Sequence, residues 1–95
     1  METATVISIH LPGPLRPYCG GASTLSLAAA TVRAALAGLA RDHTPLYRNI
    51  CDETGRVRPH LNLFVNSDHV RDRGGIDTKL TPGDVVTILP AVSGG

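Results

Sequence analysis

The sequence predicts an α+β domain in which a mixed five-stranded sheet packs on one main helix. Short segments with apolar residues at alternate positions indicate the strands, and one segment with apolar residues at helical spacing indicates the helix. The length agrees, because 95 residues are enough for one domain with one core. We expect residues 1–90 to form this domain and residues 91–95 to be a flexible C-terminal tail ending in Gly-Gly.

The first two strands are expected to form a hairpin. In residues 5–11, apolar side chains such as Ile7 and Ile9 alternate with more polar ones, as in a strand with one buried face. Prolines and glycines predict a turn-rich connection over residues 12–23, and residues 24–28 form a short second strand. Because turn residues join the two strands, we expect them to run antiparallel.

The helix is predicted directly after this hairpin. Thr31 is the expected N-cap, and residues 32–40 carry apolar side chains at helical spacing on a background of alanines. Thr44, which is followed by a proline, is expected to begin a short turn that carries Leu46 and Ile50 inward.

Three further strands are predicted in the second half of the chain, after a polar surface loop over residues 51–60. They are residues 61–65, a short strand around residues 69–71, and residues 85–89, where Pro90 ends the ladder. One helix can cover only one face of the resulting sheet. The economical arrangement is a mixed sheet around this helix, with the first and last strands adjacent at the centre of the sheet. This is the β-grasp, or ubiquitin-like, arrangement. An iron–sulfur version is excluded, since Cys19 and Cys51 cannot supply four cluster ligands.

The composition excludes several classes of function. A formal charge of +1 and three aromatic residues do not fit a nucleic-acid-binding protein. No segment resembles a signal peptide or a membrane span, so we expect a cytoplasmic protein with no membrane partner and with Cys19 and Cys51 as free thiols. Cysteines and histidines do not occur at metal-ligand spacings, which predicts no metal site. No nucleophile–base set can be assembled, so we expect no catalytic residue and no enzyme activity of the chain itself.

The last residues carry the strongest functional signal. Gly94 and Gly95 have no side chains, so together with Val92 and Ser93 they can thread a narrow channel in another protein and lie close to a nucleotide. The Gly95 carboxylate is a poor electrophile until it is joined to AMP, after which a sulfur or nitrogen nucleophile can attack it. We therefore expect Gly95 to be the reacting residue.

Alternation in the strands also predicts a docking face. If Val86 and Ile88 of the last strand face the helix, Leu89 faces the opposite side of the sheet. Phe64 alternates with the inward-facing residues of its own strand and should stand on that same outer face. An exposed Phe beside an exposed Leu is a typical interface anchor. His69 lies near this face, and Arg71 can meet acidic groups of a partner.

Several motifs resemble the ThiS/MoaD family of sulfur-carrier proteins over nearly the whole chain. The matching positions are Asn62–Asn66, Arg71 with Gly74–Gly75, Thr78, Leu80, Gly83–Asp84 and Val86–Gly95. Arg71, Gly74–Gly75 and Pro90–Val92 are most similar to the carriers that deliver sulfide for cysteine synthesis. The small subunit of molybdopterin synthase more often closes with two prolines, where this chain has Pro90 and Ala91.

The resemblance implies a cycle with partner enzymes. A ubiquitin-activating-type adenylyltransferase uses ATP to adenylate Gly95, and a sulfur donor then converts the carboxylate to a thiocarboxylate. The carrier gives its sulfur to an acceptor enzyme, which for the cysteine type is a PLP-dependent cysteine synthase, and a metalloprotease releases the extended tail. No cofactor is then bound by this chain, because ATP and PLP belong to its partners.

Three functions remain open from the sequence. The first is a sulfur carrier for cysteine or for another product such as thiamine or molybdopterin. The second is a ubiquitin-like modifier, in which Gly95 ends in an isopeptide bond to lysine. The third is a β-grasp interaction module with an inert tail, which would keep its function after removal of Gly94 and Gly95.

Overall fold

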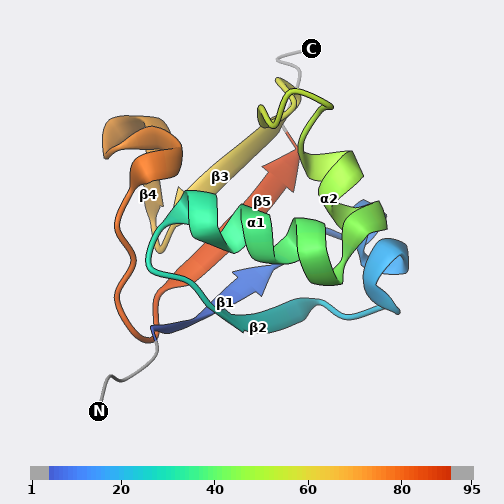
Figure 1. The fold of residues 1–95 in the computed structure, drawn as a ribbon, viewed down its shortest axis with the longest axis horizontal. Helices are drawn as coiled ribbons and strands as arrows, with labels where there is room; N and C mark the ends of the chain where they lie inside the picture. The colour runs from blue at the N-terminus through green and yellow to red at the C-terminus, as the bar shows by residue number, and fades with distance from the viewer. Residues whose placement is uncertain (1–4, 91–95) are drawn as a thin grey trace.

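Five strands form one mixed sheet in the computed structural model, which describes residues 5–90 (Figure 1). They are β1 (Val6–His10), β2 (Thr24–Ala28), β3 (Leu61–Val65), β4 (Asp68–His69) and β5 (Val85–Pro90), in the spatial order β2-β1-β5-β3-β4. β1 and β5 are parallel at the centre, and every other pair of neighbours is antiparallel. The predicted β-grasp architecture is confirmed.

The helix α1 (Val32–Asp42) crosses one face of this sheet, and the shorter α2 (Thr44–Ile50) follows it (Figure 1). The apolar stripe of α1 is buried, with Val32 and Leu39 fully inaccessible to solvent. Leu46 and Ile50 of α2 are also fully buried, as their inward direction predicted. The inner faces of the strands complete the core with Ile7, Ile9, Leu63, Val65, Val86 and Ile88.

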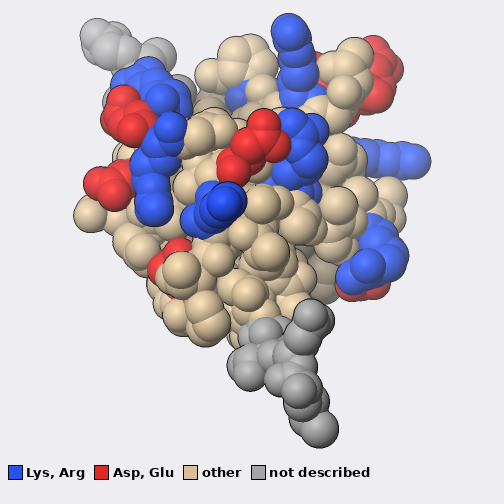
Figure 2. Space-filling model, turned by 60° about the vertical axis from the view of Figure 1, so that its left-hand side comes forward, with Lys and Arg blue, Asp and Glu red and all other residues tan. Residues whose placement is uncertain are grey.

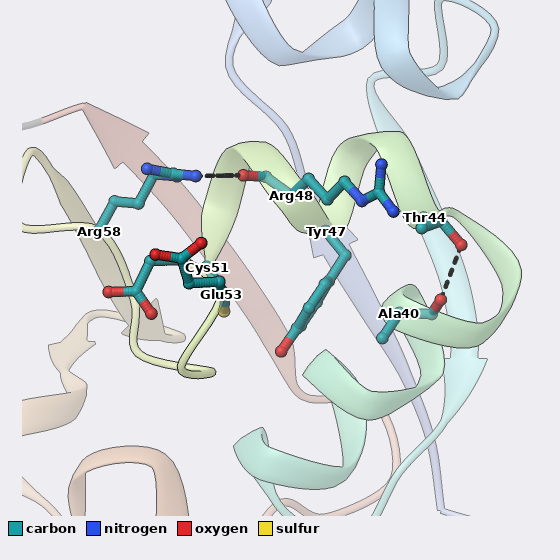
Figure 3. Close-up of a pocket in the computed structure, with 8 residues that line it drawn as sticks. Ala40, Thr44, Tyr47, Arg48, Cys51, Glu53 and Arg58 are labelled. Atoms are coloured by element: carbon teal, nitrogen blue, oxygen red, sulfur yellow. Dashed lines mark hydrogen bonds between the residues drawn. The ribbon is translucent and has the colours of Figure 1, made fainter.

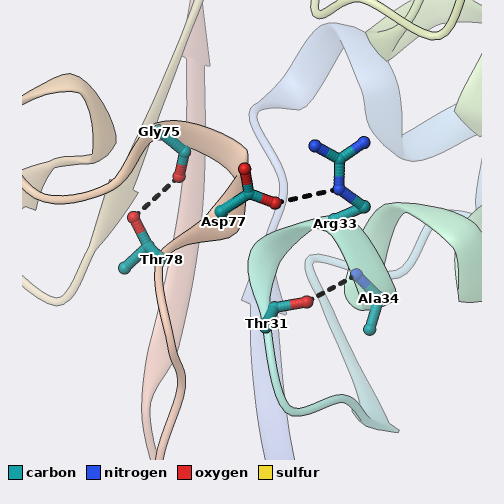
Figure 4. A network of polar contacts seen from close by, with 6 residues as sticks. All are labelled: Thr31, Arg33, Ala34, Gly75, Asp77 and Thr78. Atoms are coloured by element: carbon teal, nitrogen blue, oxygen red, sulfur yellow. Dashed lines mark hydrogen bonds and ion pairs between the residues drawn. The ribbon is translucent and has the colours of Figure 1, made fainter.

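The start of α1 is fixed by two polar contacts (Figure 4). The predicted N-cap is confirmed, because the Thr31 hydroxyl oxygen accepts a hydrogen bond from the Ala34 N–H at 3.1 Å. Arg33 pairs with Asp77 at 3.0 Å and so links α1 to the 3₁₀ helix η3 (Gly75–Asp77). Next to it, buried Thr78 accepts a bond from the Gly74 N–H and donates one to the Gly75 carbonyl.

Two connections differ from their predictions. The segment expected to be a turn-rich connection contains a 3₁₀ helix, η1 (Gly13–Cys19), which ends at Gly20 with φ +71°. Proline is compatible with this short helix because its fixed φ suits the first turn. The loop after α2 is less exposed than predicted, because Cys51 is buried and its backbone forms an isolated β-bridge with Val57.

Two strand ends also differ. β4 begins one residue earlier than expected and ends at His69, because the Arg71 N–H turns back to His69 Nδ1 and the chain continues as η2 (Val70–Asp72). β5 does not stop at Leu89: Pro90 still lies opposite Leu61 of β3. Proline lacks only the donor of a ladder pair, so it is tolerated at the last position of the strand.

Candidate functional site

The site is built around the end of β5, the central strand that leads into the C-terminal segment. The predicted reacting residue Gly95 and the predicted threading residues Val92, Ser93 and Gly94 lie outside the described residues. Leu89 and Pro90 are both exposed at the strand end that precedes them. In Figure 1, β5 points toward the end of the sheet where α2 lies.

The sheet face opposite α1 carries the predicted docking residues Phe64 and Leu89. Phe64 lies opposite Thr87 in the β3–β5 register, and Leu89 lies opposite Asn62. Phe64 and Leu89 are therefore diagonal neighbours on one face. Leu89 is 44% exposed and Phe64 is half-buried, so the structure brings the two predicted anchors together on the open face.

His69 adjoins Phe64 on this face, and its ring makes three contacts, one of them with Phe64. The two rings pack edge to face with centroids 5.1 Å apart. The Nδ1 atom of His69 accepts a bond from the Arg71 N–H at 3.1 Å, so the ring proton lies on Nε2 and is donated to Asn62 Oδ1 at 3.0 Å. This arrangement fixes the ring of His69 and therefore the direction of Phe64.

Arg71 does not share the open face. It lies in η2 with an exposed side chain and lines a groove of about 200 Å³ at the free side of β3. The other lining residues are Val57, Arg58, Pro59, Leu61, Leu63, His69, Val70, Gly75 and Ile76. The four predicted docking residues thus divide between two adjacent surfaces, with His69 bordering both.

A larger open pocket of about 770 Å³ lies between the end of α1, α2 and the segment that follows α2 (Figure 3). Its lining residues are Ala40, Thr44, Tyr47, Arg48, Cys51, Asp52, Glu53 and Arg58. Nothing in the sequence predicts this pocket, because three separate segments form it and no motif marks any of them.

The larger pocket contains two titratable groups whose pKa values are raised. Burial raises the pKa of the Cys51 thiol and also that of the Tyr47 hydroxyl, so both groups stay protonated near neutral pH. The lining also includes the carboxylates Asp52 and Glu53, and the pKa of Asp52 is lowered because the Thr54 hydroxyl donates a hydrogen bond to it. Arg58 donates from Nε and Nη2 to the Arg48 carbonyl at 3.0 and 2.9 Å, which satisfies an acceptor at the end of α2 (Figure 3).

Charges of both signs are interspersed on the surface. Figure 2 shows blue and red side chains mixed in the upper half of that view, above a mostly tan area. Both described ion pairs, Arg33–Asp77 and Arg41–Asp42, are solvent-exposed.

Within residues 5–90, His, Cys, Asp and Glu form no group of three or more that is placed to hold a metal ion. In the same part of the chain, no helix combines the length and apolar character that a membrane crossing requires. Cys19 and Cys51 are both free, as expected.

Comparison with known proteins gives a consistent result. Residues 9–95 match the model of the ThiS family. The sulfur carrier protein CysO of Mycobacterium tuberculosis is 34% identical over 91 residues, which cover 94% of this chain and 98% of that relative. The crystal structure of M. tuberculosis CysO gives a TM-score of 0.83 at 33% identity and covers 90% of this chain and 99% of its own.

Two further relatives differ in what their names say. A chain in the crystal structure of the BexX/CysO complex of Amycolatopsis orientalis has a TM-score of 0.83 and 30% identity, covering 94% of this chain and 99% of that one. Small archaeal modifier protein 3 of Haloferax volcanii is 42% identical over 43 residues, or 45% of this chain and 47% of the modifier. The CysO relatives, which match along most of the chain, are carriers rather than enzymes, as the sequence predicted for this chain. Small archaeal modifier protein 1 of Methanosarcina acetivorans also matches over nearly the whole chain, with a TM-score of 0.82 at 27% identity, covering 99% of this chain and 100% of that one.

Proposed function

The chain belongs to the ThiS family, and from this premise we propose that it is a sulfur carrier whose working group is the carboxylate of Gly95. One observation carries the proposal: the family match extends over residues 9–95 and therefore includes Gly94 and Gly95 as well as the folded body. The body supplies a docking surface, and the C-terminal segment supplies the reacting atom.

The proposed chemistry takes place in partner enzymes. An adenylyltransferase joins the Gly95 carboxylate to AMP from ATP and releases pyrophosphate. A sulfur nucleophile then attacks the activated carbonyl carbon, AMP leaves, and a thiocarboxylate remains at Gly95. In the acceptor enzyme this sulfur becomes the nucleophile and attacks the bound substrate. Two glycines favour this sequence of steps, because a chain without side chains can pass through narrow active-site entrances.

We place the contact with the adenylyltransferase on the open face around Leu89 and Phe64. Ordering the last residues in a channel costs about 1–2 kcal/mol per residue, so the body must contribute binding free energy. Of the described large hydrophobic residues that are exposed, Leu89 is the nearest to the C-terminal segment, and the edge-to-face contact with His69 holds Phe64 beside it. Such a pair can bind before the tail enters the channel.

For the acceptor we propose a PLP-dependent cysteine synthase, followed by a metalloprotease that cleaves cysteine from the extended tail. The support is the 34% identity to a carrier named CysO over nearly its whole length. Another acceptor would leave the carrier chemistry unchanged, since only the last nucleophilic attack differs. Incubation of the thiocarboxylate form with candidate synthases, followed by mass analysis of the tail, identifies the product.

The decisive experiment is intact-mass analysis of the chain purified from its native host. The expected result is a population in which one oxygen of the terminal carboxylate is replaced by sulfur. A variant lacking Gly94 and Gly95 is the matched control and should show neither this exchange nor ATP–pyrophosphate exchange with the host's adenylyltransferase. An intact protein that never carries sulfur, and whose deletion variant keeps full function in the host, would contradict the proposal and favour an interaction module.

A ubiquitin-like modifier is the second candidate. It is favoured by the 42% identity to a small archaeal modifier protein, although the match covers under half of either chain. Both functions require adenylation of Gly95 and differ in the final nucleophile. Proteolytic digests of host proteins distinguish them, because a modifier leaves a branched glycine remnant on lysine, whereas a carrier leaves none.

A further inference from the structure

The groove lined by Arg71 exists because β4 is very short. β4 pairs only with Phe64 and Val65, so the first half of β3 has no strand beside it on that side. The segment containing Val57 borders one side of the gap, and η2 and η3 border the other. The result is a groove of about 200 Å³, below the range of about 300–1,000 Å³ typical of small-molecule pockets.

The interior of the groove is apolar. Leu61, Leu63 and Val70 are buried at its base, while Val57 and Ile76 are half-buried along its walls. A cavity of this size and lining suits one branched aliphatic side chain rather than a polar ligand.

The rim of the groove is positively charged. Arg58 and Arg71 both border it, and none of its described lining residues is Asp or Glu. Asp77, the acidic residue next to Ile76, is already paired with Arg33 at 3.0 Å. Asp72 follows Arg71 in η2 but does not line the groove. A segment with carboxylates beside its apolar side chain would therefore complement the rim.

The position of the groove connects it to the proposed tail chemistry. Leu61 lines the groove and lies opposite Pro90 at the end of β5. A protein that holds the residues after Pro90 therefore comes close to the groove as well as to the open face. His69 borders both surfaces, so the two form one continuous area around the edge of the sheet.

We propose that this groove is a second docking site, which receives one leucine- or isoleucine-sized side chain from an acidic segment of a partner that acts on the tail. The proposal rests on the function proposed above and adds to it the chemistry of the recognised partner. Insertion of the side chain excludes water from the apolar base, and Arg71 contacts a flanking carboxylate, while Arg58, which donates to the Arg48 carbonyl, adds positive charge to the rim. The groove then aligns the partner on two sides of β3 rather than on the open face alone.

The test uses the full chain labelled with ¹⁵N and an acetylated, amidated peptide, Glu-Glu-Leu-Glu-Glu, followed by NMR amide shifts. The expected result is saturable shifts at Val57, Leu63, Val70 and Ile76. Arg71→Glu should weaken binding about fivefold, the upper end of the scale for an exposed charge pair, because the substitution reverses the charge. Arg73→Glu is the matched control, because Arg73 is exposed in the same segment but does not line the groove, and it should change little.

Several outcomes would overturn the proposal. These are no saturable shifts, equal binding of a peptide with lysines in place of the glutamates, or shifts centred on Phe64 and Leu89 instead. Concentration-dependent shifts of the same groove amides without peptide would assign the groove to a second copy of the chain. Adenylation of Gly95 is measured in parallel: failed peptide binding with intact adenylation rejects the groove alone, and peptide binding without any adenylation rejects the carrier function.

Discussion

Leu89 and Val6 are two exposed aliphatic residues on the same open face, 44% and 51% exposed. They differ in position along the sheet. Since β1 and β5 are parallel, Val6 lies at the end where β5 begins, and Leu89 lies where β5 ends. If docking brings the C-terminal segment to a partner's active site, Leu89 lies close enough to that segment to take part and Val6 does not. Substitutions at the two positions therefore distinguish a specific docking contact from a general effect of surface hydrophobicity.

We predict that Leu89→Asp lowers kcat/KM for adenylation by about tenfold or more, because a charge replaces a central apolar anchor. Phe64→Asp should have the same direction of effect. Circular dichroism should show an unchanged fold in Leu89→Asp, since the side chain is exposed. Val6→Asp is the control and should keep normal kinetics; equal losses in Val6→Asp and Leu89→Asp would remove the open face as a specific docking site.

A second prediction at this scale concerns Asp84 in the turn before β5. Its carboxylate accepts bonds from the Thr81 N–H at 2.9 Å and from Asn66 Nδ2 at 3.2 Å, and these bonds lower the pKa of Asp84. A pKa lower in the folded than in the unfolded state stabilises the fold above the unfolded value of about 3.9. That contribution is lost as the pH falls through the folded pKa.

In Asp84→Asn, the free energy of unfolding should therefore decrease less between about pH 6 and about pH 3 than in the unmodified chain. Urea denaturation at the two pH values measures this difference. Asp68→Asn provides the comparison, because among the described contacts the Asp68 side chain has no hydrogen bond. Identical acid sensitivity in Asp84→Asn and the unmodified chain would show that this turn does not contribute.

Sequence alternation was sufficient to predict which single side chains share a face, because the period of two is set by backbone geometry. It placed Phe64 and Leu89 together, as the register of β3 and β5 confirms. The contacts of His69 were beyond its reach. They depend on the tight turn at Asn66, which has φ +56°, and on the side-chain bond to Asn62. Arg71 lies in η2 rather than in the expected strand, because β4 ends before it.

At the scale of elements, buried Thr78 directly follows the short helix η3 and stabilises it through its side-chain hydroxyl. Its hydroxyl accepts a hydrogen bond from the Gly74 N–H at 3.0 Å. It also donates one to the Gly75 carbonyl at 2.7 Å (Figure 4). Since Asp77 in the same helix pairs with Arg33 of α1, this network also connects the second half of the chain to α1. η3 contains no fully buried residue, and these polar contacts add to the packing of half-buried Ile76 against the core.

We therefore predict that Thr78→Val lowers the free energy of unfolding by about 0.5–1.5 kcal/mol, the net contribution of a typical hydrogen bond, because the Gly74 N–H loses its side-chain acceptor. Thr78→Ser keeps the hydroxyl and should recover most of this loss. Urea denaturation of the two variants measures the difference. A loss in Thr78→Ser as large as that in Thr78→Val would assign the effect to the methyl group instead.

Elements with a long apolar pattern were predictable, and short ones were not. α1 and β3 lie where expected because burial of a face imposes a regular period over many residues. η1 was read as a turn, since its prolines and glycines are equally compatible with both conformations. The pocket beside Tyr47 and the groove beside Arg71 arise where three or more segments meet, and such packing has no local pattern.

At the scale of the whole molecule, the central pair β1 and β5 determines where the chain enters and leaves. Because the two strands are parallel, β1 begins at one end of the sheet and β5 finishes at the other (Figure 1). The topology itself was predictable, since one helix on one face leaves few ways to arrange five strands. Additions before residue 5 are thus remote from the proposed site of chemistry.

This separation predicts different effects of the two ends on adenylation. A peptide tag placed before Met1 should leave ATP–pyrophosphate exchange unchanged. One additional residue after Gly95 should abolish it, because the carboxylate then belongs to a different residue and lies beyond the adenylating site. Measured activity of the C-terminally extended chain, without prior removal of the extra residue, would contradict the role of Gly95.

The parallel pairing of β1 with β5 also has a mechanical consequence. A motor or protease that draws on the segment after Pro90 pulls β5 along its own axis, while resistance at the opposite terminus acts on β1 in the reverse direction. The ladder between the two strands is then loaded in shear, with its bonds sharing the force, rather than opened one at a time. The folded body should therefore resist unfolding when it is pulled against a narrow opening, so that only the segment after Pro90 enters.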